Sequence, residues 1–116
     1  MFENKRERER LLREEIRHKI LLVNVNRSYP KMGNFYLAAK EAWRVNENRA
    51  KEVDYVCAVY QNIICKTFRP TKWYRFPENG YRWGFDGDSV NDSIYDNKDV
   101  GHLVKNWVGG NPVRFF

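Results

Sequence analysis

Three short segments of the chain set arginine beside aromatic residues, and this pattern has the clearest chemical use in the sequence. The segments are Trp43-Arg44, Trp73-Tyr74-Arg75 and Tyr81-Arg82-Trp83. An exposed ring can stack on a nucleobase, which is worth about 1–3 kcal/mol per base, while a guanidinium binds phosphate. The same rings also suit the core of a small domain, with the arginines facing water. We expect at least one of the tryptophans to line a cleft.

The sequence lacks the usual signatures of catalysis and of metal binding. It has no P-loop, no Gly-x-Gly-x-x-Gly motif and no Gly-x-Ser-x-Gly motif. The two histidines, His18 and His102, have no acid or nucleophile at an informative spacing, so we expect both at the surface. Zinc is not expected, because Cys57 and Cys65 do not form a Cys-x-x-Cys pair. We therefore predict a protein that is not an enzyme and that carries no metal and no cofactor.

Asp86, Asp88 and Asp92 are the nearest approach to a cluster of carboxylates. A calcium loop needs acids at alternate positions, then a glycine and a more distant glutamate, and only the first requirement is met. We therefore interpret these three residues as turn and helix-capping positions.

The composition indicates one small folded domain with an excess of positive charge. Its 116 residues include 21 lysines and arginines against 15 acids, a net charge of +6, and 16% of the residues are aromatic. Aromatic volume on this scale argues against disorder of the whole chain. The positive charge attracts phosphate groups, but it is spread along the chain and is not gathered in a tail.

Cysteine usage and the length of the apolar runs bear on the cellular compartment. Cys57 and Cys65 lie in apolar, strand-like runs, and we interpret them as buried thiols of a cytosolic protein, although a disulfide is possible if their strands pair. No run reaches the roughly 18–20 apolar residues of a membrane span, and no secretory signal is present. We expect a cytoplasmic location, or the host cytoplasm if a phage encodes the protein.

Residues 3–19 are predicted to form a charged helix, treated as a segment (1–19) separate from the main domain (20–116). Glutamate and arginine alternate here, and pairs such as Glu9–Arg13 have the i,i+4 spacing that supports a solvated helix. Leu11, Leu12 and Ile16 supply only a narrow apolar stripe. The helix therefore needs the body of the protein, a second copy in a homodimer, or a protein partner to be stable.

The remaining elements follow from hydrophobic patterning and from turn residues. Strands are expected at 20–25, 55–60, 63–68, 73–76, 81–86 and 111–116. A tight hairpin is expected at Gln61-Asn62, and Pro70 is expected to end the strand over 63–68. Short helices are expected at 35–44, at 46–53 after an Asn46 cap, and at 89–95. Residues 26–34, 77–80 and 97–110 are expected to be loops or turns. This order predicts an α+β fold, a small curved sheet or partly closed barrel with helices packed outside.

Several segments together resemble the PUA-like domain that often follows GIY-YIG nuclease modules in bacterial and phage proteins. The segments that carry the resemblance, in order, are Leu21–Tyr29, Ala42–Asn46 with Arg49-Ala50, Tyr55–Tyr60, Trp73, Arg82–Gly87 and Asn111–Arg114. The resemblance spans residues 20–116 and implies a compact β-barrel with peripheral helices, holding RNA or a modified or flipped base in a cleft. Lys40-Glu41 stands where the family has Arg-Gly, and Asn62 where it has Gly. No nuclease module is attached, so a nuclease role is not implied.

Nucleic acid, either RNA or DNA, is therefore the leading expectation for the partner. The candidate nucleic-acid-binding residues are Asn26, Arg27, Trp43, Arg44, Trp73, Arg75 and Arg82. The alternative is a small protein-interaction module, such as a phage-encoded inhibitor of a host nucleic-acid enzyme, which would present the helix of residues 3–19.

Overall fold

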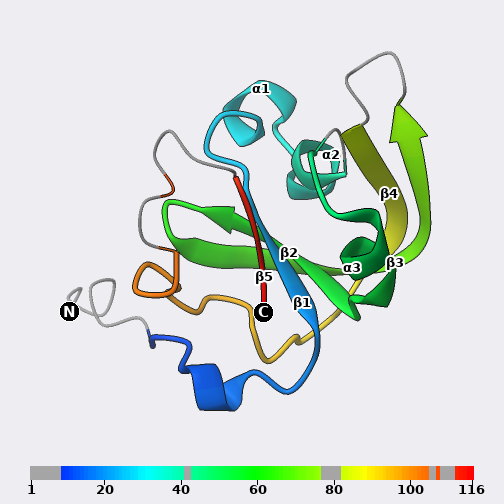
Figure 1. Cartoon of the computed structure of the whole chain (residues 1–116). Helices are drawn as coiled ribbons and strands as arrows, with labels where there is room; N and C mark the ends of the chain where they lie inside the picture. The colour runs from blue at the N-terminus through cyan, green and yellow to red at the C-terminus, as the bar shows by residue number, and fades with distance from the viewer. Residues whose placement is uncertain (1–8, 41–42, 77–81, 105–106, 108–111) are drawn as a thin grey trace.

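Five strands form one mixed sheet in the order β4-β3-β2-β1-β5 (Figure 1). The computed structural model describes residues 9–40, 43–76, 82–104, 107 and 112–116. Within them the strands are β1 Ile20–Asn24, β2 Tyr55–Tyr60, β3 Ile63–Phe76, β4 Arg82–Ser89 and β5 Val113–Phe115. The helices are α1 Tyr29–Met32, α2 Phe35–Ala39 and α3 Glu47–Glu52, and Arg13–Glu15 forms a single 3-10 turn.

The centre of the sheet is the parallel pair β1 and β2, whose residues pair from Ile20–Tyr55 to Asn24–Val59. Both strands are buried almost throughout, as expected of uninterrupted apolar runs. The three helices make the crossover between them. Strand β5 pairs antiparallel with β1, so the predicted return of residues 111–116 to the sheet is confirmed over Val113–Phe115.

The predicted hairpin between β2 and β3 is confirmed. Gln61 and Asn62 have φ angles of 52° and 67°, the left-handed conformation that a two-residue turn between twisted strands requires. A register shift in the β2–β3 ladder makes Cys65 the extra residue of a β-bulge, because Ala58 pairs with Lys66 and Val59 with Ile64. Cys57 and Cys65 form no disulfide, and both remain thiols.

The prediction that Pro70 ends a strand is wrong, because β3 continues through it to Phe76. Strand β2 accompanies β3 only as far as the Val56–Phe68 pair, and beyond this point β3 pairs with β4 alone. Pro70 sits at a register shift of that second ladder, where a missing N–H is tolerated. Opposite it, a Cβ on Gly87 would lie 2.5 Å from the Arg69 carbonyl oxygen, so this close approach requires glycine. We call residues 70–76 and 82–87 the arm.

The sheet curves at the arm but does not close into a barrel over the described residues, so the curved-sheet prediction holds and the barrel alternative does not. The reason lies in the partner of the outer edge of β4. Trp43 pairs there with Trp83, and the Phe85 N–H donates to the Lys40 carbonyl at 2.8 Å. The segment after α2 therefore occupies the edge that β5 would need for closure.

Helix boundaries follow local capping. Asn46 caps α3 as predicted, its Oδ1 accepting from the Arg49 N–H at 3.0 Å. Asn34 caps α2 in the same way, but α2 ends at Ala39 and not at residue 44, because the next residues pair with β4. The predicted loop 26–34 contains α1, which has Pro30 in its first turn and Gly33, at φ 69°, as its C-cap.

Two predicted helices are absent from the described residues. Of the helix expected over 3–19, residues 3–8 lie outside the described part, and 9–19 contain only one 3-10 turn. The Leu11 N–H donates to the Asp99 carbonyl and the Asp99 N–H to the Glu9 carbonyl, so strand-like pairing replaces helical bonds. The helix expected over 89–95 is replaced by turns. Main-chain bonds from Val90 to Thr67 and from Asn97 to Ile64 tie this segment to β3.

The predicted turn 77–80 lies outside the described residues, and the described part of 97–110 is turn and irregular chain as expected. No helix of the described part is both long and apolar enough to cross a membrane.

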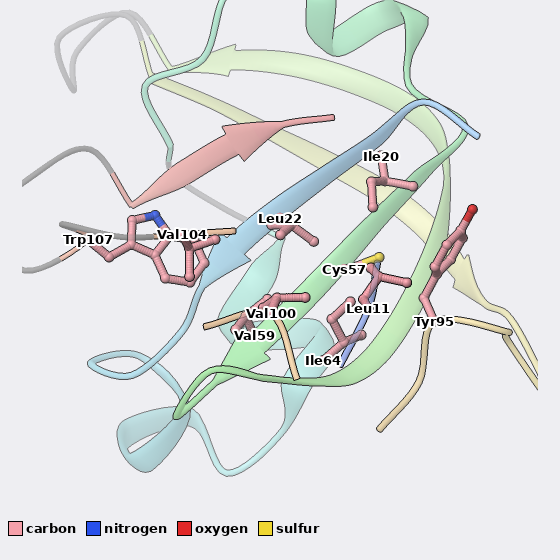
Figure 2. Packing of buried hydrophobic residues seen from close by; sticks show 10 residues of the cluster. All are labelled: Leu11, Ile20, Leu22, Cys57, Val59, Ile64, Tyr95, Val100, Val104 and Trp107. Carbon is pink, nitrogen blue, oxygen red and sulfur yellow. The ribbon is translucent and has the colours of Figure 1, made fainter. Parts of the chain in front are cut away.

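Each face of the sheet carries its own core, because successive strand residues point to opposite faces. The helix-side core consists of Leu21, Val23, Val25, Ala38, Ala39, Val56, Ala58, Phe68, Phe85 and Val113. The loop-side core, drawn in Figure 2, consists of Leu11, Ile20, Leu22, Cys57, Val59, Ile64, Tyr95, Val100, Val104 and Trp107. The N-terminal segment and the chain after β4 cover the loop side, while α2 covers the helix side.

Candidate nucleic-acid interface

Three of the aromatic and arginine positions are in register across the two strands of the arm and the segment after α2 that pairs with them. Trp43 and Trp83 exchange two main-chain hydrogen bonds of 2.8 Å each, and Trp83 is also the ladder partner of Arg75. Directly opposite residues of an antiparallel pair carry their side chains on the same face. Trp43, Trp83 and Arg75 therefore form one continuous row, which we call the tryptophan row.

The tryptophan row is anchored to the end of α2. The Trp43 indole Nε1 donates to the Ala39 carbonyl at 2.6 Å, and the Ser28 hydroxyl donates to the adjacent Ala38 carbonyl at 3.0 Å. Both bonds satisfy carbonyls that a helix end leaves without partners. Trp43 is half-buried and its ring is fixed in orientation. Its N–H is already used, so this indole can serve a ligand through its ring face but not through its polar edge.

Helix α3 lies beside the arm and supplies further positive charge (Figure 1). Lys51 Nζ lies 5.8 Å from the centre of the Trp83 ring, within the range of a cation–π contact. Lys51 also pairs with Glu47 at 2.9 Å, and this hydrogen bond and charge, with a contribution from Arg75, lower the pKa of Glu47. Both side chains are about half exposed, so we expect little stability from the pair. Its effect is to set Lys51 over the row.

The other predicted residues of the arm have different placements. Trp73 is half-buried and packs on Phe85, with ring centres 5.4 Å apart, so like Trp43 it packs against the helix-side core. Arg44 is exposed and adjoins Trp43 in the chain. Arg82 is exposed and pairs with Phe76, which places it on the opposite face of the arm from Trp83.

Asn26 and Arg27 belong to the other end of the sheet. Asn26 Oδ1 accepts from the Gln61 N–H at 2.7 Å, so its side chain holds the β2–β3 hairpin. The arm extends from the far end of the same strand β3, away from this hairpin (Figure 1). Arg27 is exposed beside Asn26. The structure thus brings Trp43 and Arg75 together, with Arg44 next to Trp43 in the chain, and does not bring Asn26 to them.

Two residues of this surface, Trp83 and Lys51, are missing from the sequence-based set. Trp83 alternates with Arg82 and Gly84 in β4, and this alternation already placed it, and not Arg82, on the inner face. The i,i+4 spacing of Glu47 and Lys51 in α3 was visible in the sequence, but the position of α3 against the arm was not.

The aspartates have structural surroundings. Asp86 lies 3.4 Å from Lys40 Nζ, Asp88 is exposed at the end of β4, and Asp92 occupies a turn with φ 56°. Over the described residues, no group of three or more histidine, cysteine, aspartate or glutamate side chains is placed to hold a metal ion.

Buried thiol chemistry is also suppressed at Cys57. Burial raises the pKa of Cys57 to about 12, and the Sγ lies 3.8 Å from Thr67 Oγ1 inside the loop-side core. A thiol in this state is neither charged nor accessible at neutral pH, which makes it a poor nucleophile.

No family model, no curated protein and no solved structure matches the chain.

Proposed function

We propose that this protein is a nucleic-acid-binding module that holds an unpaired base against the tryptophan row while neighbouring cations bind the phosphates. The observation that carries the proposal is the register of Trp43, Trp83 and Arg75 with Lys51 above them. The resemblance to PUA-like domains supports the same class of ligand.

The physical case combines steering with stacking. A net charge of +6 attracts a polyanion, and Arg75 of the row with Lys51 above it gives this attraction a location beside aromatic rings. Because the Trp43 N–H is bound to Ala39, recognition through this residue is by ring stacking. Stacking tolerates any base but needs an unpaired one, so we expect single strands to bind better than duplexes and sequence preference to be weak.

The alternative of a protein-interaction module depends on a helix over residues 3–19. Residues 9–19 instead pack on the chain's own core, where Leu11 is 1% exposed. Nucleic acid is therefore the partner that the geometry supports better.

Charge-removing variants test the proposal without disturbing the core. Lys51→Gln and Arg75→Gln should each weaken binding of a labelled single-stranded oligonucleotide about five- to tenfold and reduce the salt slope by about one. Lys31→Gln removes the same charge from exposed α1, away from the row, and should change affinity less than about twofold. Fluorescence anisotropy over a salt series, with RNA, DNA and duplex probes, measures all three. Equal losses in the three variants, or no binding at low salt, would overturn the proposal.

Ring variants separate stacking from packing. Trp83→Phe and Trp43→Phe keep an aromatic face, whereas Trp83→Ala and Trp43→Ala remove it. We expect binding to follow the presence of the ring, with a loss of about 1–3 kcal/mol for each alanine variant. Circular dichroism checks that each variant is folded, and an alanine variant that folds and binds normally would remove that tryptophan from the site.

A further inference from the structure

A second basic surface lies where the N-terminal segment passes the starts of β1 and β2, beside the end of α3. A pocket of about 440 Å³ opens there. Its lining residues are Arg13, Ile16, Arg17, His18, Lys19, Asp54 and Phe116. None of them belongs to the tryptophan row, so this pocket needs its own explanation.

Positive charge predominates in this pocket. Among the lining side chains, Arg13, Arg17 and Lys19 are cationic and Asp54 is anionic, and Asp54 already accepts a hydrogen bond from the Lys19 main-chain N–H at 2.9 Å. Glu52 lies 3.6 Å from Lys19 Nζ, but both side chains are about two-thirds exposed and their attraction is weakened by water. The Arg13 guanidinium lies 5.1 Å from the centre of the Phe116 ring, which orients it. The pocket therefore favours an anion.

His18 adds a ring N–H donor, and the Tyr95 hydroxyl determines which ring nitrogen can offer it. The buried Tyr95 hydroxyl accepts a hydrogen bond from the Arg17 N–H at 3.0 Å and lies 2.8 Å from His18 Nδ1. A hydroxyl has one proton to donate. Donation of that proton to Nδ1 makes Nδ1 an acceptor, which places the ring proton of a neutral His18 on Nε2. The Nε2–H is then available to a ligand of the pocket.

The same contacts make the pocket rigid. Burial is the main cause that raises the pKa of Tyr95, so its hydroxyl stays protonated and keeps its role as donor. The His18 ring also packs edge-on against Tyr55, with centres 4.8 Å apart. A donor that is held in place before a ligand arrives loses little freedom on binding.

We propose that this pocket binds a phosphoryl group, carried either by a free nucleotide or by the end of a nucleic-acid strand. Guanidinium forks match the oxygens of phosphate in geometry and charge, and Arg13 and Arg17 supply two of them. Lys19 and the His18 Nε2–H supply further donors. The half-buried side chains of Ile16 and Phe116 provide an apolar wall beside these donors for the attached sugar. The pocket is independent of the tryptophan row, so either can fail without the other.

Calorimetric titration of the full chain with inorganic phosphate and with AMP, at constant ionic strength, tests the pocket. We expect saturable binding of both, weakened at least tenfold in Arg17→Gln and in Arg13→Gln. Arg10→Gln is the matched control, because Arg10 is an exposed arginine of the same segment that does not line the pocket, and it should bind like the unaltered chain. Melting temperatures check that each variant is folded. Absence of saturable binding, or equal affinity in Arg17→Gln and Arg10→Gln, would overturn the proposal.

Two further arms identify the source of the phosphoryl group and keep this proposal apart from the interface. Lys31→Gln, which removes a charge outside both the pocket and the tryptophan row, should leave phosphate binding unchanged. A single-stranded oligonucleotide with a 5′-phosphate should bind at least fivefold tighter than its 5′-hydroxyl counterpart if strand ends are the ligand, and Arg17→Gln should abolish the difference. Equal affinity of the two oligonucleotides, with AMP binding retained, assigns the pocket to free nucleotides.

Discussion

The two faces of the central sheet differ in what covers them and in how completely they are covered. On the loop side, irregular chain seals a mostly aliphatic core that includes the fully buried ring of Tyr95 (Figure 2). On the helix side, aromatic residues dominate the margin, and Trp43, Trp73 and Trp83 stay half-buried. Neighbouring residues of β1 show the division, because Leu22 faces the first core and Val23 the second.

The difference shows that burial of a core from water does not depend on regular secondary structure in this protein. Helices α2 and α3 have only 5 and 6 residues and leave the rings at the arm partly uncovered. The described parts of the N-terminal segment and of the chain after β4 have almost no helix, yet their side chains cover the loop-side core. Main-chain bonds such as that from Leu11 to Asp99 hold these segments in place. We infer that the loop-side core serves stability and that the half-buried rings of the helix-side margin are the aromatic surface open to a base.

The largest expected effects come from removing one large residue from each core. Phe85→Ala should destabilise the fold by about 3–5 kcal/mol, because Phe85 contacts Phe68, Tyr36 and Trp73. Leu22→Ala on the loop side should cost about 2–5 kcal/mol. Urea denaturation measures both. If Phe85→Ala costs less than 1 kcal/mol, the helix-side margin is not a packed core and the comparison fails.

A smaller effect is expected from the Tyr95 hydroxyl, which connects the loop-side core to the N-terminal segment by hydrogen bonds. Tyr95→Phe keeps the ring but leaves the Arg17 N–H and His18 Nδ1 without the hydroxyl, which should cost about 1–3 kcal/mol. Thermal unfolding checks this value. Tyr60→Phe is a control at a half-buried tyrosine of the helix side, and an equal loss there would mean that the hydroxyl bonds are not the cause.

Alkaline pH should weaken the loop side through Cys57. Burial raises the pKa of Cys57 to about 12 from the ordinary 9.0, so above pH 9 the unfolded chain releases this proton while the folded chain keeps it. Stability therefore falls as pH rises, by about 1.4 kcal/mol for each pH unit between the two pKa values.

Comparison of pH profiles tests this source of alkaline instability. Urea unfolding of the native chain and of Cys57→Ala from neutral pH to about pH 10 should show a flatter profile in the variant. A Cys65→Ala variant, at the half-buried bulge position, serves as the control. Identical profiles in all three proteins would contradict the assignment to Cys57.

The smallest expected effects concern the two caps on the helix side. Asn46→Ala removes the acceptor for the Arg49 N–H, and Asn34→Ala removes the acceptor for the Leu37 N–H. Each should cost about 1 kcal/mol. Asn46→Asp keeps the oxygen and should retain the stability, as measured by thermal melts. If Asn46→Ala keeps its stability but loses oligonucleotide binding, the cap is needed to hold Lys51 in place and is not needed for the stability of the fold.

Elements with local signals were predictable from the sequence. Three features depend on residues next to one another in the chain. They are the apolar runs of β1 and β2, the two-residue turn at Gln61 and Asn62, and the Asn46 cap. The failures depend on distant partners. Residues 9–19 have helical spacing but pair with Asp99, and Pro70 ends no strand because the only strand beside it there is β4.

The candidate site divides in the same way. The adjacency of Trp43 to Arg44 is visible in the sequence, but the pairing of Trp43 with Trp83 is a long-range contact that no spacing reveals. The prediction that Asn26 belongs to the same site did not foresee its hydrogen bond to Gln61. This bond depends on the pairing of β1 with β2, which brings the hairpin next to Asn26.

The antiparallel pairing of β1 with β5 has a consequence for how the protein is made. During synthesis β1 emerges from the ribosome well before Val113–Phe115, which pair with its outer edge. Until then the backbone groups of Ile20 and Asn24, which bond Phe116 and Pro112 in the folded protein, lie open on a hydrophobic strand, the type of edge that attracts other extended chains. The pairing with β5 is therefore what keeps this edge of β1 from pairing with other extended chains.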